Sequence, residues 1–250
     1  KMMEAITAAG ARHSTTPPDG LVADILFLAL KPQVMDAVVP GLKSLVGPQT
    51  TVVSVAAGKT IASMEGHLGK AAMVRAMPNT PAIVGRAVTG IAAGERATDW
   101  AVETTVQLFE TVGKTIVLEE SRIDALSTIS GSGPAYVFYL IEQLTLAAKH
   151  HGFNDQDAAL LVNETFLGAS ELLAASGKTP EALRKQVTSP NGTTERAIAR
   201  MGETDLEAMF VEATDADFDP VREVATSMNV QLENFKKSTA PKAPAAAPKK

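Results

Sequence analysis

The order of apolar and polar residues divides the chain into two parts. Up to about residue 119, short apolar runs alternate with helical stretches. Residues Ile25 to Leu30 form an unbroken apolar run closed by Lys31-Pro32, which is typical of a strand buried on both faces. Similar runs predict four further strands, Val52–Val55, Ala72–Ala76, Val88–Ala92 and Thr115–Leu118. Strands that alternate with helices, such as Thr98–Val112, predict a parallel α/β sheet.

After Glu120 long helical segments replace the strands. Three helices are expected, the first from Pro134 to about His151, the second from Asn154 to Gly177, and the third opening at Thr179-Pro180-Glu181. They are rich in alanine and apolar on more than one face, which fits either an all-helical core or a helical dimer interface.

The change at Glu120 predicts a domain boundary. We expect a dinucleotide-binding domain over residues 1–119 and a helical dimerisation and substrate domain over 120–235. Residues 236–250 are almost entirely Lys, Ala and Pro, a composition too poor in apolar side chains to fold, and predict a disordered tail.

Composition narrows the function classes. The net charge of −5 gives no basic field for binding nucleic acid, and the absence of cysteine excludes disulfides, thiolate zinc sites and thiol nucleophiles. The histidines and carboxylates show no metal-ligand spacing, so no metal is expected. No apolar run reaches membrane-spanning length and no signal sequence is visible. We therefore expect a soluble, cytoplasmic protein without a membrane partner.

Three predicted strands end in compact loops, where ligands bind in parallel α/β sheets. The loops are Ala29-Leu30-Lys31-Pro32, Val55-Ala56-Ala57-Gly58 and Pro78-Asn79-Thr80-Pro81. Small residues let a ligand approach the backbone, Lys31 offers a cation, and Asn79 offers a donor and an acceptor. Each loop alone is also explained by ordinary strand termination, with a solvated Lys31 and a turn at Asn79.

Two hydroxyl-rich stretches precede predicted helices. Ser130-Gly131-Ser132-Gly133-Pro134 is either an anion site or a flexible cap. The stretch from Val187 to Thr194 packs four hydroxyls just before a helix that begins near Glu195. Its backbone N–H groups could hold a carboxylate and leave a threonine hydroxyl facing the reacting atom, and the alternative is an ordinary threonine cap.

Taken together, five segments resemble pyrroline-5-carboxylate reductase, the last enzyme of proline biosynthesis. They are Lys31-Pro32-Gln33, Ser54–Gly58, Met77–Pro81, Ser130–Tyr136 and Val187–Thr194, within a match from about Val22 to Gly202. The resemblance implies a Rossmann-like N-terminal domain, a helical domain that interlocks with its twin, and active sites between subunits of a homodimer or larger homo-oligomer.

The resemblance also implies roles for individual residues. The NADPH or NADH site would be lined by Ala29, Leu30, Lys31, Pro32, Val55, Ala56 and Ala57, with Asn79 and Thr80 near the nicotinamide. The cyclic imino acid would be held by Glu120, Ser189, Gly192, Thr193 and Thr194. Thr194 matches the catalytic hydroxyl beside the imine nitrogen.

The chain departs from the family pattern in three places. The opening strand with its Gly-x-Gly-x-x-Gly turn is missing, so the chain is expected to begin in or after the second βα unit. Asn191 stands where relatives usually have glycine, which a left-handed turn tolerates. Asp217-Phe218-Asp219-Pro220 is expected to kink or split the final helix.

The resulting prediction is an oxidoreductase that reduces pyrroline-5-carboxylate to proline by hydride transfer from NAD(P)H. One alternative is a related reductase of another small imine or hydroxy acid. Such an enzyme is expected to use a lysine base on the first long helix of the second domain, where this chain has Lys149 only at the far end. Another alternative is a non-catalytic, dimerising module with a degenerate nucleotide fold.

Overall fold

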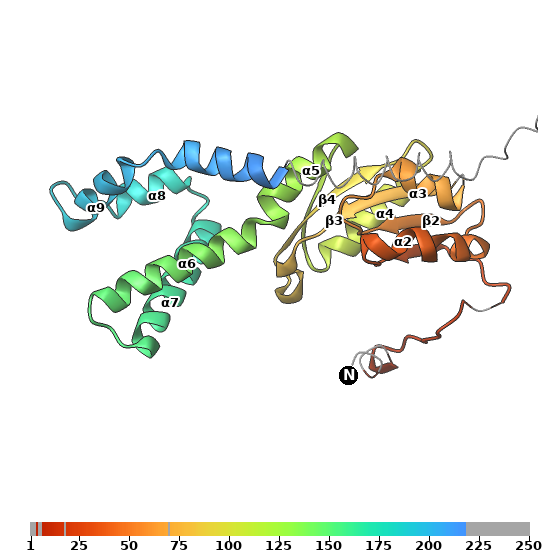
Figure 1. Cartoon of the computed structure of the whole chain (residues 1–250), viewed down its shortest axis with the longest axis horizontal. Coiled ribbons are helices and arrows are strands. Elements are labelled where there is room, and N and C mark those ends of the chain that lie inside the picture. Colours follow the sequence, from red (N-terminus) through yellow and green to blue (C-terminus); the bar gives the residue numbers. More distant parts are fainter. Residues whose placement is uncertain (1–3, 5–6, 18, 70, 219–250) are drawn as a thin grey trace, which may run out of the picture. The chain divides into compact units, whose positions relative to one another are not determined.

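The computed structural model describes residues 4, 7–17, 19–69 and 71–218. The described residues form two compact units, one made of those up to residue 127 together with Phe218 and the other of residues 128–217. We call them the sheet unit and the helical unit (Figure 1). The tail predicted over residues 236–250 lies outside the described residues.

The sheet unit contains a five-stranded sheet whose strands lie side by side in chain order. The strands are β1 (Ile25–Leu28), β2 (Thr51–Ser54), β3 (Ala72–Met77), β4 (Ala87–Ala93) and β5 (Gly113–Val117). All five predicted strands are confirmed. β1, β2 and β3 run parallel, and so do β4 and β5.

The pairing of β3 with β4 is antiparallel, which the prediction of a parallel sheet missed. The connection between these strands holds only a short 3₁₀ helix, η2 (Thr80–Val84), and a left-handed Gly85. A parallel crossover needs a dozen or more residues, so this short connection reverses the chain direction.

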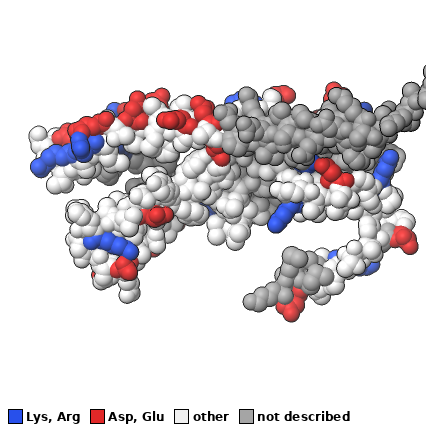
Figure 2. All heavy atoms as spheres, in the orientation of Figure 1, with Lys and Arg blue, Asp and Glu red and all other residues white. Residues whose placement is uncertain are grey.

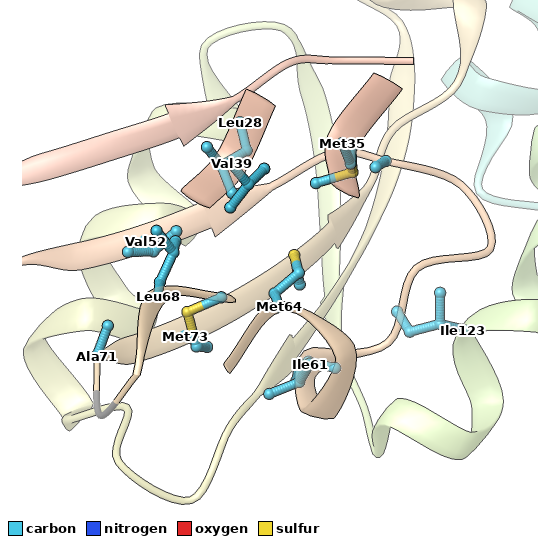
Figure 3. Close-up of a cluster of buried hydrophobic side chains, with 12 residues drawn as sticks. Leu28, Met35, Val39, Val52, Ile61, Met64, Leu68, Ala71, Met73 and Ile123 are labelled. Carbon is cyan, nitrogen blue, oxygen red and sulfur yellow. The ribbon is translucent and has the colours of Figure 1, made fainter. Parts of the chain in front are cut away.

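Helices cover both faces of the sheet. They are α2 (Pro32–Val38), the 3₁₀ helix η1 (Val39–Leu45), α3 (Ile61–Leu68) and α4 (Asp99–Glu110), the last confirming the helix predicted near Thr98–Val112. Side chains of a strand alternate between faces. Met73 accordingly joins the core cluster of α2 and α3 (Figure 3), whereas Val74 joins the cluster of α4.

Helical turns connect β5 to the helical unit. The chain passes through η3 (Glu120–Arg122), α5 (Ile123–Leu126) and a π-helical turn, η4 (Ser127–Gly131). Of the two interpretations of the Ser-Gly stretch, the flexible cap is not what the structure has, because Ser130 and Gly131 belong to this turn and Ser132 gives α6 no side-chain cap.

The helical unit confirms the predicted helices. It contains α6 (Gly133–His150), α7 (Asp155–Ser176), α8 (Pro180–Gln186), α9 (Thr193–Gly202) and residues 206–217 of a further helix that is described as far as residue 218. Asn154 caps α7 by accepting from the Asp157 N–H at 2.9 Å, and Thr179 caps α8 in the same way. The left-handed Gly177 ends α7.

The helical unit buries few of its apolar side chains. Among its described residues only Ala158 and Val162 are fully buried hydrophobics. Large apolar side chains remain exposed along α6 and α7, including Phe138, Leu144, Leu160, Leu167 and Leu172. Much of the helical unit's surface in Figure 2 carries no charge, with acidic side chains gathered along one edge. This favours a dimer interface over a self-contained helical core.

Helix α7 is long and apolar enough to cross a membrane, judged by length and composition. The expectation that no apolar run reaches that length is therefore wrong. The exposed apolar face of α7 has another explanation if a second copy of the chain covers it, since dimer interfaces resemble a domain core cut in half.

The helix over residues 206–218 runs through Asp217 and Phe218, where an interruption was expected. Asp217 accepts a hydrogen bond from the Tyr136 hydroxyl on α6, with 3.2 Å between the oxygens. Burial, together with the charge of Asp217, raises the pKa of Tyr136 above its usual value. The remaining residues of the expected interruption, Asp219 and Pro220, lie outside the described residues.

Candidate active site

The predicted cofactor segments lie at one edge of the sheet. β1, β2 and β3 are parallel, so the loops that follow them meet where these strands end. The Val55 N–H donates to the Leu28 carbonyl at 3.2 Å, which ties the second loop to the first. The structure thus brings Ala29–Pro32, Val55–Ala57 and Asn79–Thr80 to one place.

The loop after β2 is shaped to expose its backbone. Ser54, fully buried, accepts from the Ala56 N–H at 3.3 Å and turns the chain outward. Ala56 is buried and Ala57 is exposed. Gly58 has a left-handed φ of 69°, and a Cβ built there meets nothing within 4 Å. A flat ligand can therefore approach this loop closely.

The side chains of Lys31 and Asn79 differ in their contacts within the protein. Lys31 precedes α2 and is exposed, and no ion pair or hydrogen bond of its ammonium is present within the described part of the chain. It stays available to an anionic ligand. The Asn79 side-chain oxygen accepts from the Val88 N–H at 2.9 Å, so this side chain also fixes the start of β4.

A buried lysine just after the second loop is paired with α2, the helix that follows the first loop. Lys59 follows Gly58 and donates to both carboxylate oxygens of Asp36 on α2, at 2.8 and 3.1 Å. His67 on α3 lies 3.1 Å from the same carboxylate. Burial raises the pKa of the Asp36 carboxyl, but Lys59 and His67 outweigh it, so the net pKa lies below its usual value.

This depressed pKa predicts a pH-dependent contribution to stability. The Asp36 carboxylate stabilises the folded state above its unfolded pKa of about 4, and the contribution is lost as the pH falls through the lower folded pKa. We expect Asp36→Asn to lower the free energy of unfolding by about 1 kcal/mol at neutral pH, because Asp36 is half exposed. The difference should shrink below about pH 4.

Urea unfolding at a series of pH values measures this difference. Asp19→Asn is the control, since Asp19 is exposed and forms no ion pair with any residue that the structure describes. If Asp36→Asn lowers the free energy of unfolding by the same amount at every pH, down to the lowest pH measured, the stabilisation by Asp36 is not electrostatic and the prediction is contradicted.

The turn before α9 lies in the helical unit and carries the predicted substrate residues other than Glu120. The Gly192 N–H donates to the Ser189 carbonyl at 3.0 Å, and a Cβ at Gly192 would stand 2.9 Å from that oxygen, so only glycine fits. Asn191 has a left-handed φ of 61°, as expected of an asparagine in a glycine position. Its N–H donates to the Glu195 side chain at 2.7 Å.

Thr194 does not cap its helix. The N-cap residue of α9 is Gly192, without any side-chain cap, so Thr193 and Thr194 occupy the first two helical positions. The simple alternative of a threonine cap is therefore wrong. Thr194 is exposed, and its hydroxyl has no hydrogen-bond partner among the described residues. Because first-turn N–H groups have no helical acceptor, they can bind an anion beside this hydroxyl.

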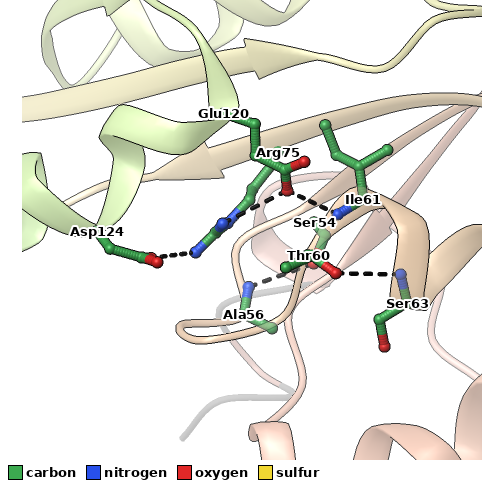
Figure 4. A network of polar contacts seen from close by, with 8 residues as sticks. All are labelled: Ser54, Ala56, Thr60, Ile61, Ser63, Arg75, Glu120 and Asp124. Atoms are coloured by element: carbon green, nitrogen blue, oxygen red, sulfur yellow. Dashed lines mark hydrogen bonds and ion pairs between the residues drawn. The ribbon is translucent and has the colours of Figure 1, made fainter. Parts of the chain in front are cut away.

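Glu120 is held by neighbours that the sequence analysis overlooked. One carboxylate oxygen accepts from the Ile61 N–H at 2.7 Å and lies 3.4 Å from the guanidinium of Arg75 (Figure 4). Arg75 also donates to Asp124 at 2.8 Å. The available signal was a charged residue inside the apolar run of β3, because a charge buried in a strand needs a partner.

The fold and these loops define a class of protein. A mostly parallel sheet with exposed small residues and an available lysine at its carboxyl edge, joined to a helical unit, is typical of dinucleotide-dependent oxidoreductases.

Comparison with known proteins narrows the class to a family. Residues 120–224 match the family model for pyrroline-5-carboxylate reductase dimerisation. The Pseudomonas aeruginosa pyrroline-5-carboxylate reductase is 40% identical over 78% of this chain and 72% of its own length. The Coxiella burnetii enzyme structure is 34% identical, with a TM-score of 0.83, over 87% of this chain and 82% of that one.

A more distant structure supports the fold alone. The Plasmodium falciparum pyrroline carboxylate reductase, solved with NADP bound, is 24% identical with a TM-score of 0.72, over 81% of this chain and 78% of that one. On the combined matches, the chain belongs to the pyrroline-5-carboxylate reductase family.

Proposed function

We propose that this protein reduces pyrroline-5-carboxylate to proline with NADPH or NADH, acting as a homodimer or larger homo-oligomer. The observation that carries the proposal is the exposed hydroxyl of Thr194, which caps no helix and lies beside the N–H groups of the first turn of α9. In a chain of this family, such a hydroxyl and such an anion site suit a substrate that has a carboxylate close to a C=N bond.

The described residues fit a dinucleotide at the sheet edge. Ala57 and Gly58 leave open space over the backbone, and the Lys31 ammonium is available to a phosphate. Leu30, Pro32 and Val55 supply apolar surface, and Asn79 and Thr80 follow β3 at the same edge. The bound reduced nicotinamide would supply the hydride.

The substrate residues would bind and orient the imino acid. Backbone N–H groups of Thr193 and Thr194 can hold its carboxylate, in the turn that Ser189 and Gly192 close. If the substrate reacts as its N-protonated iminium form, the C=N π electrons become the nitrogen lone pair as the ring carbon accepts the hydride, and the product is the neutral amine. The Thr194 hydroxyl would hydrogen-bond this nitrogen and orient it. The second carboxylate oxygen of Glu120, for which the described residues provide no partner, is left for the substrate.

Steady-state assays test this proposal directly. Oxidation of NADPH or NADH, followed by the nicotinamide absorbance, should depend on added pyrroline-5-carboxylate and yield an equal amount of proline. Oxidation that requires a hydroxy or keto acid instead would favour the related reductase. If neither NADPH nor NADH binds, the result would favour the non-catalytic module.

The lysine required by the alternative reductase is engaged elsewhere. Lys149 lies at the end of α6 and forms an ion pair with Asp155 at 2.7 Å. A general base must reach its substrate with a free nitrogen, so Lys149 is poorly suited to that role.

The dimerisation match predicts the effect of a charge on α7. Leu167 is 53% exposed in the single chain. If a second chain covers it, Leu167→Asp places an unpaired charge in an apolar interface and should raise the dimer dissociation constant roughly 100-fold or more. Sedimentation velocity at micromolar concentration measures this constant.

Leu108→Asp is the matched control, because Leu108 is similarly exposed but lies on α4 of the sheet unit. The interface assignment fails if Leu167→Asp and Leu108→Asp sediment alike as dimers.

We also propose the functional division of the chain into residues 1–119 for the dinucleotide and 120–235 for dimerisation and substrate. A cytoplasmic location fits an enzyme of amino-acid biosynthesis, and fractionation of cells that express the full chain tests it.

A further inference from the structure

Arg75 is a buried charge at the centre of a polar network. It lies in β3 and is only 3% exposed. One terminal nitrogen is 2.8 Å from Asp124 and the other 3.4 Å from Glu120, while its Nε has no partner among the described residues. A buried guanidinium is tolerated only when paired, so Arg75 holds both carboxylates close to β3.

Glu120, which Arg75 holds near β3, also contacts the start of α3. Its carboxylate accepts the Ile61 N–H, one of the N–H groups that the first turn of a helix leaves without an acceptor. The Thr60 hydroxyl accepts the Ser63 N–H at 3.2 Å in the same turn. The start of α3 is therefore closed by the protein's own groups (Figure 4). It is not left open for a phosphate.

The network joins three segments of the candidate site. α3 directly follows the loop Val55–Gly58, and β3 leads into Asn79 and Thr80. The third segment is Glu120–Leu126, which is also anchored by the fully buried Ile123 in the core. A change at Arg75 should thus reach both cofactor loops, although Arg75 belongs to neither loop and contacts only Glu120 among the proposed substrate residues.

We propose that Arg75 is a positioning residue, which acts through Glu120 and Asp124 to fix the cofactor loop after β2 relative to the nicotinamide loop after β3. This inference rests on the proposed function for the identity of the ligand. It adds to that function a residue that controls cofactor binding without touching the cofactor. Arg75 holds Glu120 on the Ile61 N–H, and Glu120 holds the start of α3.

Two substitutions test the proposal in the full-length protein. Arg75→Lys keeps the charge but has one donor head, which cannot satisfy two carboxylates in the geometry of a guanidinium. Asp124→Asn keeps Arg75 and removes one charge. We expect each variant to raise the dissociation constant of NADPH about threefold to tenfold and to speed amide hydrogen exchange at Ile61. The thermal unfolding midpoint should fall much less than in Arg75→Met, which leaves two carboxylates uncompensated.

Arg96→Met is the matched control. Arg96 forms an ion pair at 3.4 Å with Glu65, which lies on α3. The Arg96 side chain is 43% exposed and does not belong to the network. It should leave NADPH affinity and Ile61 exchange unchanged. Folded Arg75→Lys and Asp124→Asn variants with unchanged NADPH affinity and unchanged Ile61 exchange would overturn the proposal. Both readouts are independent of turnover, so an inactive parent protein would count against the proposed function and not against this network.

Discussion

Replacing Thr194 with alanine is expected to reduce the turnover number roughly tenfold to a thousandfold, the usual loss when one hydrogen bond to developing charge is removed. Thr194 occupies the second position of α9 and is exposed, and its hydroxyl has no partner within the part of the chain that the structure describes. NADPH affinity should hardly change, because the proposed partner of the Thr194 hydroxyl is the imino acid and not the cofactor. Steady-state kinetics with pyrroline-5-carboxylate, together with NADPH titration, measure both effects.

Stability separates a catalytic Thr194 from a structural one. Since Gly192 is the N-cap residue, alanine at position 194 removes no cap and is itself the better helix former. The melting temperature of Thr194→Ala should therefore equal or slightly exceed that of the parent. Thr194→Ser keeps the hydroxyl and should keep most of the activity. Full activity of Thr194→Ala would exclude the proposed role.

Ala57→Asp is expected to weaken NADPH binding by at least about tenfold, which corresponds to about 1.4 kcal/mol. Ala57 is exposed in the loop after β2, between the buried Ala56 and the left-handed Gly58. A carboxylate there would occupy the space of the ligand and repel its phosphates. Fluorescence titration with NADPH gives the affinity, and raising the salt concentration should narrow the difference by screening the charge.

Ala57→Ser is the matched control, because it adds a small neutral group at the same position. It should bind NADPH within about threefold of the parent, well under the tenfold that 1.4 kcal/mol represents. Parent-like affinity of both variants would remove the loop after β2 from the cofactor site.

The sheet and its loops could be predicted from local sequence. An apolar run such as Val52–Val55 is buried on both faces, and it ends where small residues begin. The antiparallel direction of β4 was missed because the prediction rested on the alternation of strands and helices. The β3–β4 connection is too short for the crossover that a parallel pair needs.

The ion pairs of the site could not be predicted in the same way. Lys59 pairs with a residue 23 positions away, and Arg75 with residues 45 and 49 positions away. Such contacts depend on the packed fold, and neither helical nor strand periodicity encodes them. The sequence also left open whether a threonine caps α9. The structure has no side-chain cap there, and the Glu195 side chain instead accepts from the Asn191 N–H.

Isotope transfer tests the central claim most directly. The protein is supplied with pyrroline-5-carboxylate and NADPH that carries deuterium at both hydrogen positions of nicotinamide carbon 4, and the product is analysed by mass spectrometry. We predict proline with deuterium on ring carbon 5, formed in equal amount to the NADP released. Proline without deuterium, or no substrate-dependent oxidation of either NADPH or NADH, would contradict the account.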